Sequence, residues 1–267
     1  MAAALALGLV IGSFLNVVIA RVPHGKSVWQ PRSACPGCAA PIAWRDNIPL
    51  LSFVALRGRC RHCGMAIGWR YPLIEAGTAA AFTVAYLVLG PTLDFAVAAA
   101  LLAALIAITG IDLAHQIIPD VISLPGIAAG FAVNLGLGRI AAADRLCSSG
   151  PAAAVAACAP AWLDSLIGIA VGGGIFFVII VASRGGMGGG DMKLGAMLGA
   201  FLGWKLGLLG VLLGVLGGGA AAICLLLLRR KGRKEAIPFG PFLALGGAIA
   251  LLWGDKILDW YFGRFAP

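Results

Sequence analysis

Residues 184–200 read RGGMGGGDMKLGAMLGA and join two long apolar runs. Asp191 stands in the middle of this stretch, directly after the three glycines Gly188 to Gly190. A carboxylate at a membrane boundary is costly and commonly marks a functional site. Glycines lack a Cβ, so a second backbone or a substrate can approach them closely. A solvated polar loop between two helices would explain the same residues, so chemistry at Asp191 requires a second carboxylate beside it.

The composition identifies the class of protein. The chain has 267 residues, of which 61% are hydrophobic and 12% are charged. A soluble domain carries about twice that charged share. The apolar runs recur at roughly the 20-residue length with which a helix crosses a bilayer. We therefore expect an all-α polytopic membrane protein with about eight transmembrane helices in a lipid bilayer. The first run, without a basic residue ahead of it, predicts a retained helix rather than a cleaved signal peptide.

The distribution of charge orients the chain. Residues 21–71 form a hydrophilic loop with eight basic residues and a single acid, Asp46. Lys and Arg beside membrane spans favour the cytoplasmic side, so we expect this loop in the cytoplasm and the N-terminus outside. The predicted organisation is a first transmembrane helix over 1–20, a cytoplasmic zinc-binding loop over 21–71 and a transmembrane bundle over 72–267. Further spans are expected at 72–90, 95–111, 121–138, 165–183, 192–202, 206–228 and 238–253, with a turn at 203–205. The basic cluster at 229–234 then falls on the inner side, and an alanine-rich loop, 139–164, falls outside without an assigned role.

Four cysteines in the hydrophilic loop have the spacing of a metal site. They form two Cys-x-x-Cys pairs separated by 21 residues, namely Cys35 with Cys38 and Cys60 with Cys63. Each pair can hold one side of a tetrahedral ion, and four thiolates suit Zn²⁺. Two disulfides are the alternative, which a reducing cytoplasm disfavours. His62 could replace a cysteine, but four cysteines are the simpler set. Four protein ligands leave no open position, so we expect one structural zinc per chain.

The other three cysteines lie outside the predicted metal site. Cys224 lies in an apolar span and is predicted to be an inert packed thiol. Cys147 and Cys158 lie on the expected outer side, where they could form a disulfide.

Asp112 is the candidate partner of Asp191, because the predicted topology places both at the inner membrane face. Two carboxylates held close together cannot both ionise easily, so one can act as a general acid and the other as a general base for water. Asp120 is a rival, but its position favours an N-cap for a helix beginning at Val121. His115 is predicted to form interfacial hydrogen bonds. The remaining acids in the outer segments are predicted to be solvated: Asp94, Asp144, Asp164, Asp255 and Asp259.

Several segments together resemble one known family. They are residues 12–18, 32–38, 42–52, 57–60, 70–75, 111–120, 188–193 and 237–242. The chain resembles the type IV prepilin peptidases, GxGD-type intramembrane aspartic proteases that also act as N-methyltransferases in pilus assembly and type II secretion. The resemblance implies that Asp112 and Asp191 are the catalytic aspartates. It also implies cleavage of a short basic leader from prepilins or pseudopilins at the bacterial inner membrane, and methylation of the new N-terminal amine by S-adenosylmethionine.

The methyl-donor site has no motif of its own, since no glycine-rich nucleotide-binding turn is present. We expect the pocket between the zinc loop and the helix ends, but the sequence does not identify its residues. Separately, Asn16 and Glu75 are candidates for supporting roles only. An ion-coupled transporter would also hold carboxylates in a helix bundle, but it predicts acids at the midplane and paired halves. A membrane-tethered zinc module for nucleic acid is a further alternative. The basic loop lacks interleaved aromatic residues, so we expect no nucleic-acid partner.

Overall fold

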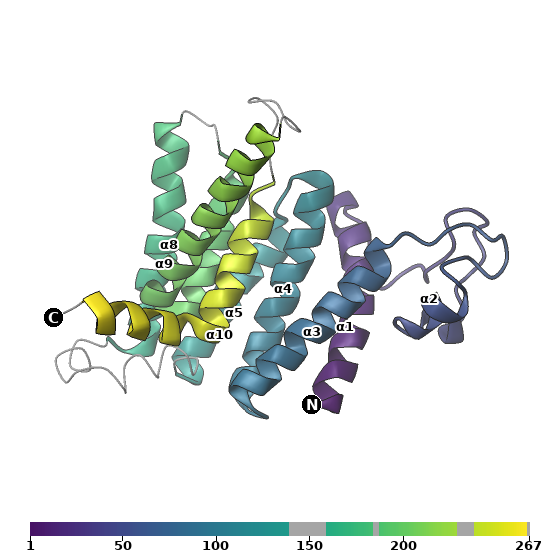
Figure 1. Ribbon diagram of the computed structural model, residues 1–267, viewed down its shortest axis with the longest axis horizontal. Helices are drawn as coiled ribbons and strands as arrows, with labels where there is room; N and C mark the ends of the chain where they lie inside the picture. Colours follow the sequence, from purple (N-terminus) through teal and green to yellow (C-terminus); the bar gives the residue numbers. More distant parts are fainter. Residues whose placement is uncertain (139–158, 184–186, 229–237, 266–267) are drawn as a thin grey trace. The chain divides into compact units, whose positions relative to one another are not determined.

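The computed structural model describes residues 1–138, 159–183, 187–228 and 238–265 (Figure 1). In these ranges the chain is all-α, as the composition predicts, with no strand beyond two isolated bridges. The chain divides into two compact units, Met1–Ile111 and Asp112–Pro267. The helices of the first unit are α1 (Ala2–Arg21), η1 (Val22–His24), η2 (Trp44–Asn47), α2 (Leu51–Ala55), α3 (Arg70–Leu89) and most of α4 (Leu93–His115). The second unit holds the last turn of α4, α5 (Asp120–Gly136), α8 (Ala161–Ala182), α9 (Gly189–Leu227) and α10 (Gly240–Phe265).

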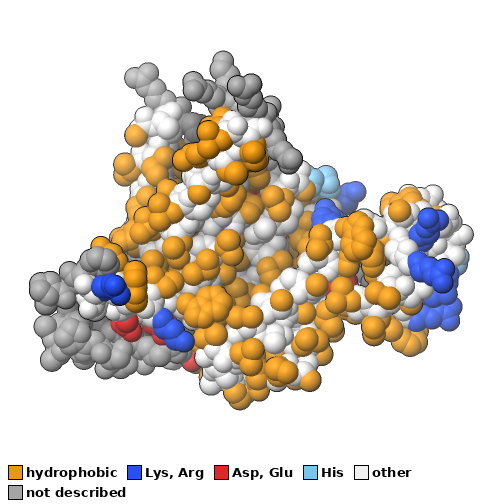
Figure 2. Space-filling model, viewed as in Figure 1, with side chains coloured by type: hydrophobic (Ala, Val, Ile, Leu, Met, Phe, Trp, Pro, Cys, Tyr) orange, Lys and Arg blue, Asp and Glu red, His pale blue; other side chains and the backbone are white. Residues whose placement is uncertain are grey.

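Both units contain helices that are long and apolar enough to span a membrane. Within the described residues, six helices are long and apolar enough to cross a bilayer: α1, α3, α4, α8, α9 and α10. The apolar helix α5 is shorter. Large apolar side chains such as Leu87, Val178 and Leu216 lie exposed on these helices, as expected of surfaces that face lipid. Figure 2 shows apolar side chains over the helices and Lys and Arg side chains gathered on the loop between α1 and α3.

Close contact between α1 and α3 organises the first unit. Gly8 and Gly12 are four residues apart and therefore share one face of α1. A Cβ added to Gly8 would lie 2.6 Å from Ala79 Cα, and one added to Gly12 would lie 2.8 Å from Glu75 Cα. Small residues at this spacing let two membrane helices meet at backbone distance. Asn16, one turn further along the same face, donates from Nδ2 to the Gly12 and Tyr71 carbonyls at 3.3 and 3.1 Å.

A break at Gly203 divides α9 into two arms. Gly203 has φ 74° and ψ 178°, which is not helical and which favours glycine. Beyond it the chain turns back, because a Cβ on Gly207 would lie 3.0 Å from Gly199 Cα. In a straight helix residues eight apart are separated by about 12 Å. The turn predicted at 203–205 is thus confirmed.

Side chains from neighbouring helices satisfy the carbonyls that this break leaves free. Asn134 Nδ2 on α5 donates to Ala200 O at 2.8 Å and to Phe201 O at 3.2 Å. Ser165 Oγ on α8 donates to Ala200 O at 2.7 Å. A bilayer offers no water to carbonyls at membrane depth, so such internal donors are required. These bonds connect α5 and α8 to the first arm of α9.

The end of the chain differs from the expectation. The last span was expected to end at Trp253, but α10 continues to Phe265. Asp255 is only 3% exposed, so the prediction that it is solvated is wrong. The reason is packing, since Gly254 beside it lies against Leu206 and Leu209 of α9. Asp164 is also half-buried, with its carboxylate next to Gly203.

Candidate active site and metal centre

The two candidate catalytic acids both lie in the second unit. Asp112 occupies the last turn of α4 and is 5% exposed. Asp191 occupies the first turn of α9 and is half-buried. The Asp112 carboxylate is near enough to act electrostatically on Asp191. The structure therefore brings together two acids that are far apart in the sequence.

Two further contacts hold the surrounding segments together. A Cβ on Gly190 would lie 2.9 Å from Ile118 Cβ, so the glycine before Asp191 lets the segment after α4 pack against α9. Lys193 Nζ lies 2.5 Å from Asp120 Oδ1. The helix α5 begins at Asp120 after Pro119, without a side-chain cap, so the prediction of an Asp120 N-cap is wrong. Its carboxylate binds Lys193 instead, because α9 brings a cation within reach.

Gly240 contacts a candidate catalytic acid, which reasoning from single side chains missed. Its backbone N–H donates to Asp112 Oδ2 at 2.9 Å. Gly240 is the first residue of α10, where N–H groups have no partner within the helix and carry partial positive charge. A Cβ there would lie 2.7 Å from the same oxygen, so only glycine fits without displacement. The sequence held two signals: residues 237–242 are among the segments that resemble the family, and Pro241 favours the first turn of a helix.

The four loop cysteines form one cluster in the first unit. Their sulfurs all lie within 4.8 Å of one another, and the Sγ atoms of Cys35 and Cys63 are 3.7 Å apart. Tetrahedral zinc with Zn–S bonds of about 2.3 Å separates its sulfurs by about 3.8 Å. His62 is not part of the cluster. The residues present therefore fit one four-coordinate metal ion.

The two halves of the cluster repeat one local structure. In each, the first cysteine N–H donates to a carbonyl five residues on, Cys35 to Ala40 O at 2.9 Å and Cys60 to Met65 O at 2.8 Å. The residue after the second cysteine has positive φ, 55° at Ala39 and 71° at Gly64. This turn points both sulfurs of a pair to the same side, as a shared ion requires.

The thiol pKa values reveal crowding among the sulfurs. The backbone N–H groups of Cys38 and Gly37 lower the pKa of Cys35 to about 6. At Cys63 the Met65 N–H lowers the pKa, but burial and the three other sulfurs outweigh it and raise the pKa to about 11. Four thiolates at this distance repel one another, and a divalent cation would remove that repulsion.

The other cysteine predictions have different outcomes. Cys224 is exposed on α9, so the prediction that it is packed is wrong. At this position of a membrane helix, an exposed side chain faces away from the bundle. Cys147 and Cys158 lie outside the described residues, as does the basic cluster at 229–234.

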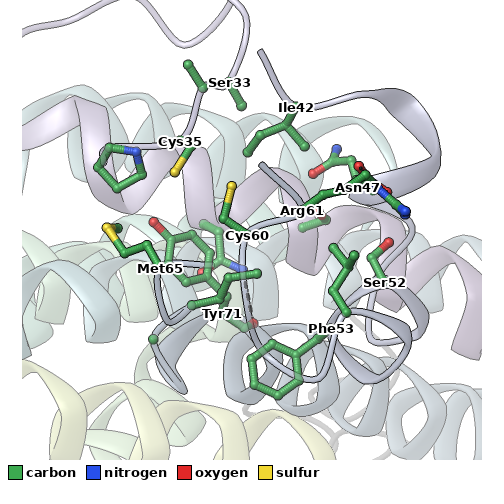
Figure 3. A pocket seen from close by; sticks show the side chains of 18 of the residues that line it. Ser33, Cys35, Ile42, Asn47, Ser52, Phe53, Cys60, Arg61, Met65 and Tyr71 are labelled. Carbon is green, nitrogen blue, oxygen red and sulfur yellow. Dashed lines mark hydrogen bonds and ion pairs between the residues drawn. The ribbon is translucent and has the colours of Figure 1, made fainter. Parts of the chain in front are cut away.

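A cavity of about 360 Å³ lies beneath the cysteine loop within the first unit. Figure 3 shows Cys60, Arg61, Phe53 and Tyr71 among the residues around it. Asn16 and Glu75, for which the sequence predicts supporting roles, line its inner end. Glu75 Oε2 accepts a 2.8 Å hydrogen bond from the Leu50 N–H. The cavity therefore reaches from the metal cluster to the α1–α3 contact.

The comparison with known proteins identifies the family. Residues 99–223 match the model of the Type IV leader peptidase family, and residues 6–89 match the Bacterial Peptidase A24 N-terminal domain. A prepilin leader peptidase/N-methyltransferase of Aeromonas hydrophila is 38% identical over 282 residues, which cover 96% of this chain and 92% of the relative. The chain belongs to the type IV leader peptidase family.

Other family members match at similar levels. The relative of the same description from Pseudomonas aeruginosa is 37% identical over 283 residues, covering 96% of this chain and 91% of the relative. That from Myxococcus xanthus is 43% identical over 227 residues, covering 83% and 62%. No solved structure matches the chain. Both candidate acids fall within the region that matches the leader peptidase model, and the four cysteines fall within the N-terminal one.

Proposed function

We propose that this protein removes the short basic leader from type IV prepilins or pseudopilins and then methylates the new N-terminal amine with S-adenosylmethionine. The observation that carries the proposal is the placement of Asp112 and Asp191 in one corner of the second unit, with Gly240 bonded to Asp112. Family membership and the descriptions of the relatives as prepilin leader peptidase/N-methyltransferases support both activities.

In the proposed cleavage, Asp112 is the general base and Asp191 the general acid. Asp112 takes a proton from water as the water oxygen attacks the scissile carbonyl carbon. Asp191 gives its proton to the carbonyl oxygen, which forms a neutral tetrahedral intermediate. The C–N bond then breaks, its electron pair stays on nitrogen, and the proton held by Asp112 passes to the leaving amine. The hydroxyl proton returns to Asp191, so both acids regain their initial state.

Their different surroundings support this division of roles. The Asp112 carboxylate accepts an N–H bond from the positive end of α10, which favours its charged form. Asp191 accepts no hydrogen bond from the described part of the chain. Its neighbour Asp112 disfavours a second negative charge. One proton shared by the pair would thus reside mainly on Asp191.

Methyl transfer needs no metal or redox partner. The neutral amine attacks the methyl carbon of S-adenosylmethionine, and the carbon–sulfur electrons remain on sulfur. The methylated ammonium then releases a proton to water. We propose zinc as the ion of the cysteine cluster, where Cys35, Cys38, Cys60 and Cys63 would hold it. With four thiolate ligands it would fix the loop and leave no position for substrate.

The proposed orientation of the chain in the membrane is based on the basic loop, residues 21–71. The cysteine cluster and the acid pair face the cytoplasm, and the N-terminus lies outside the inner membrane. Reporter fusions at the N-terminus and within 21–71 test this orientation independently of activity.

The test of function is direct. Purified protein is incubated with a full-length prepilin and S-adenosylmethionine, and the pilin N-terminus is analysed by mass spectrometry. We expect loss of the leader and a mass gain of one methyl group. A prepilin that stays intact, with the protein folded and inserted, overturns the proposal. Asp120→Asn serves as the control acid in the same corner, because its carboxylate is committed to Lys193.

A further inference from the structure

The cavity beneath the cysteine loop is enclosed by parts of one unit that are distant in the sequence. Its wall includes Val17 and Arg21 from α1, Phe53 from α2 and Glu75 from α3, together with residues of both Cys-x-x-Cys turns. The volume of about 360 Å³ falls within the range of small-molecule sites, about 300–1,000 Å³.

One carboxylate on this wall is already neutralised. Arg61 contacts Asp46 with both Nε and Nη2, at 2.6 to 3.1 Å. This bidentate hydrogen bonding lowers the pKa of Asp46 and fixes it as an anion. Asp46 and Arg61 therefore form a closed pair that brings no net charge to the cavity.

Two other charged groups on the wall have no opposite charge beside them. Glu75 is 9% exposed and, among the described residues, forms no ion pair; its carboxylate accepts a hydrogen bond from the Leu50 N–H. Arg21 donates to the Ser27 and Pro31 carbonyls at 3.0 and 2.7 Å, and the described residues give it no carboxylate either. A buried carboxylate without a cation is costly, so the wall is suited to a ligand with both a positive and a negative group.

A third polar group adds to this wall. Asn16 is 4% exposed, and its Oδ1 has no hydrogen-bond partner in the described structure. Its amide orientation is fixed, because Nδ2 already donates to the Gly12 and Tyr71 carbonyls. Buried acceptors without donors are uncommon and commonly mark a missing ligand or water.

The rest of the wall is apolar and aromatic. Ile42, Phe53, Met65 and Tyr71 contribute to it, and Figure 3 shows them around the opening. Apolar and aromatic walls with a few placed polar groups are typical of sites for small molecules and cofactors.

We propose that this cavity binds the methyl donor, an adenosyl sulfonium amino acid, with Glu75 facing its cationic groups and Arg21 its carboxylate. The inference rests on the proposed methyltransferase function and assigns it a site. S-adenosylmethionine carries a sulfonium, an ammonium and a carboxylate beside an adenine, which matches the two unpaired charges and the apolar wall. The N-terminus of a pilin supplies an ammonium but no carboxylate beside it, so it would neutralise Glu75 but offer Arg21 no opposite charge.

The first test isolates the charge of Glu75. Glu75→Gln keeps an oxygen that can accept from the Leu50 N–H and removes the negative charge. Binding of radiolabelled S-adenosylmethionine to the full-length protein in detergent should weaken about tenfold or more, as expected for loss of a charged contact. Metal content and cleavage of prepilin should stay at wild-type level.

Two further variants test whether the donor occupies the cavity, and neither removes a hydrogen bond. Val17 and Val18 are adjacent, half-buried residues of α1, and only Val17 lines the cavity. Val17→Phe should fill the space and weaken donor binding about tenfold or more. Val18→Phe, of identical chemistry, should bind the donor as wild type does.

Two ligands that differ in their carboxylate test the proposed contact of Arg21 with that group. Arg21→Gln should weaken S-adenosylmethionine binding but leave binding of its decarboxylated analogue unchanged, because that analogue has no carboxylate to lose. Equal weakening of both ligands would overturn the role of Arg21.

The outcomes of these binding experiments distinguish a failure of this donor site from a failure of the proposed methyltransferase function. If folded Glu75→Gln and Val17→Phe proteins bind the donor with wild-type affinity, the cavity is not the donor site, even where the wild type methylates pilin. If the wild type itself neither binds S-adenosylmethionine nor methylates a pre-cleaved pilin, the methyltransferase function fails and the site falls with it.

Discussion

The backbone N–H of Gly240 donates a 2.9 Å hydrogen bond to Asp112 Oδ2 across 128 residues of sequence. This bond places the first turn of α10 against the last turn of α4. Among the described residues, Asp112 therefore has a hydrogen-bond donor and Asp191 has none. The assignment of Asp112 as the base and Asp191 as the acid depends on this asymmetry.

Asp112→Asn and Asp191→Asn should each abolish cleavage, because an amide can neither take the proton from water nor protonate the carbonyl. The double variant should be no worse than either single one, since the pair acts as a unit. Initial rates on a purified prepilin measure this, with insertion checked by expression and gel filtration. Asp120→Asn should retain most activity, and substantial cleavage by either dyad variant would contradict the assignment.

Gly240→Ala should reduce the cleavage rate about 100-fold, the effect expected when a catalytic group moves by about 1 Å. The added Cβ would lie 2.7 Å from Asp112 Oδ2 and must displace it. Gly263→Ala on the same helix is the matched control, because a Cβ there meets nothing within 4 Å. Wild-type cleavage by Gly240→Ala would show that the Gly240 contact does not matter for catalysis.

Elemental analysis should find about one zinc per chain, as a four-thiolate site requires. Cys35→Ser combined with Cys38→Ser should lose the metal and increase proteolysis within residues 21–71. Cys224→Ser should keep the metal, because Cys224 lies outside the cluster. Full metal content in the double variant would mean that the ligands are wrongly assigned.

The same metal site should matter more for methylation than for cleavage. Cys60→Ser with Cys63→Ser removes half of the cluster that borders the cavity, while the acid pair belongs to the other unit. The ratio of methylated to cleaved pilin should therefore fall. A variant that cleaves poorly but methylates normally what it cleaves would reverse this expectation.

Gly199→Ala should destabilise the second unit by about 1–3 kcal/mol, because the added Cβ would overlap the Gly168 backbone of α8. Gly219→Ala on the second arm of α9 meets nothing within 4 Å and should have little effect on stability. The thermal midpoints in detergent distinguish the two. Equal midpoints would argue against backbone contact between α8 and α9.

Local patterns in the sequence predicted much of the fold. The apolar runs predicted the helices, and Gly203 marked the break in α9. Both features are predictable because each depends on a short stretch of chain. The cysteine spacing likewise predicted the cluster before its geometry was known. Asp112 and Asp191 were paired through the predicted topology, which places both at the inner membrane face and depends on counting the apolar runs between them.

Contacts between distant helices were not predictable in the same way. Asp120 was expected to cap its own helix, but Lys193, 73 residues away, binds it. Asp255 was expected in solvent, but the continuation of α10 buries it. The Gly240 N–H and the cavity near Glu75 depend on how helices pack, which no single segment encodes.

Cleavage and methylation are proposed to use separate sites, one in each unit. The most direct measurement is mass spectrometry of pilin N-termini after incubation with Asp191→Asn or Glu75→Gln protein, using both full-length prepilin and pre-cleaved pilin. We expect Asp191→Asn to leave prepilin intact but to methylate pre-cleaved pilin. We expect Glu75→Gln to cleave prepilin but to leave the product largely unmethylated. If Asp191→Asn fails to methylate pre-cleaved pilin, or Glu75→Gln loses both activities while folded, the two activities do not have separate sites.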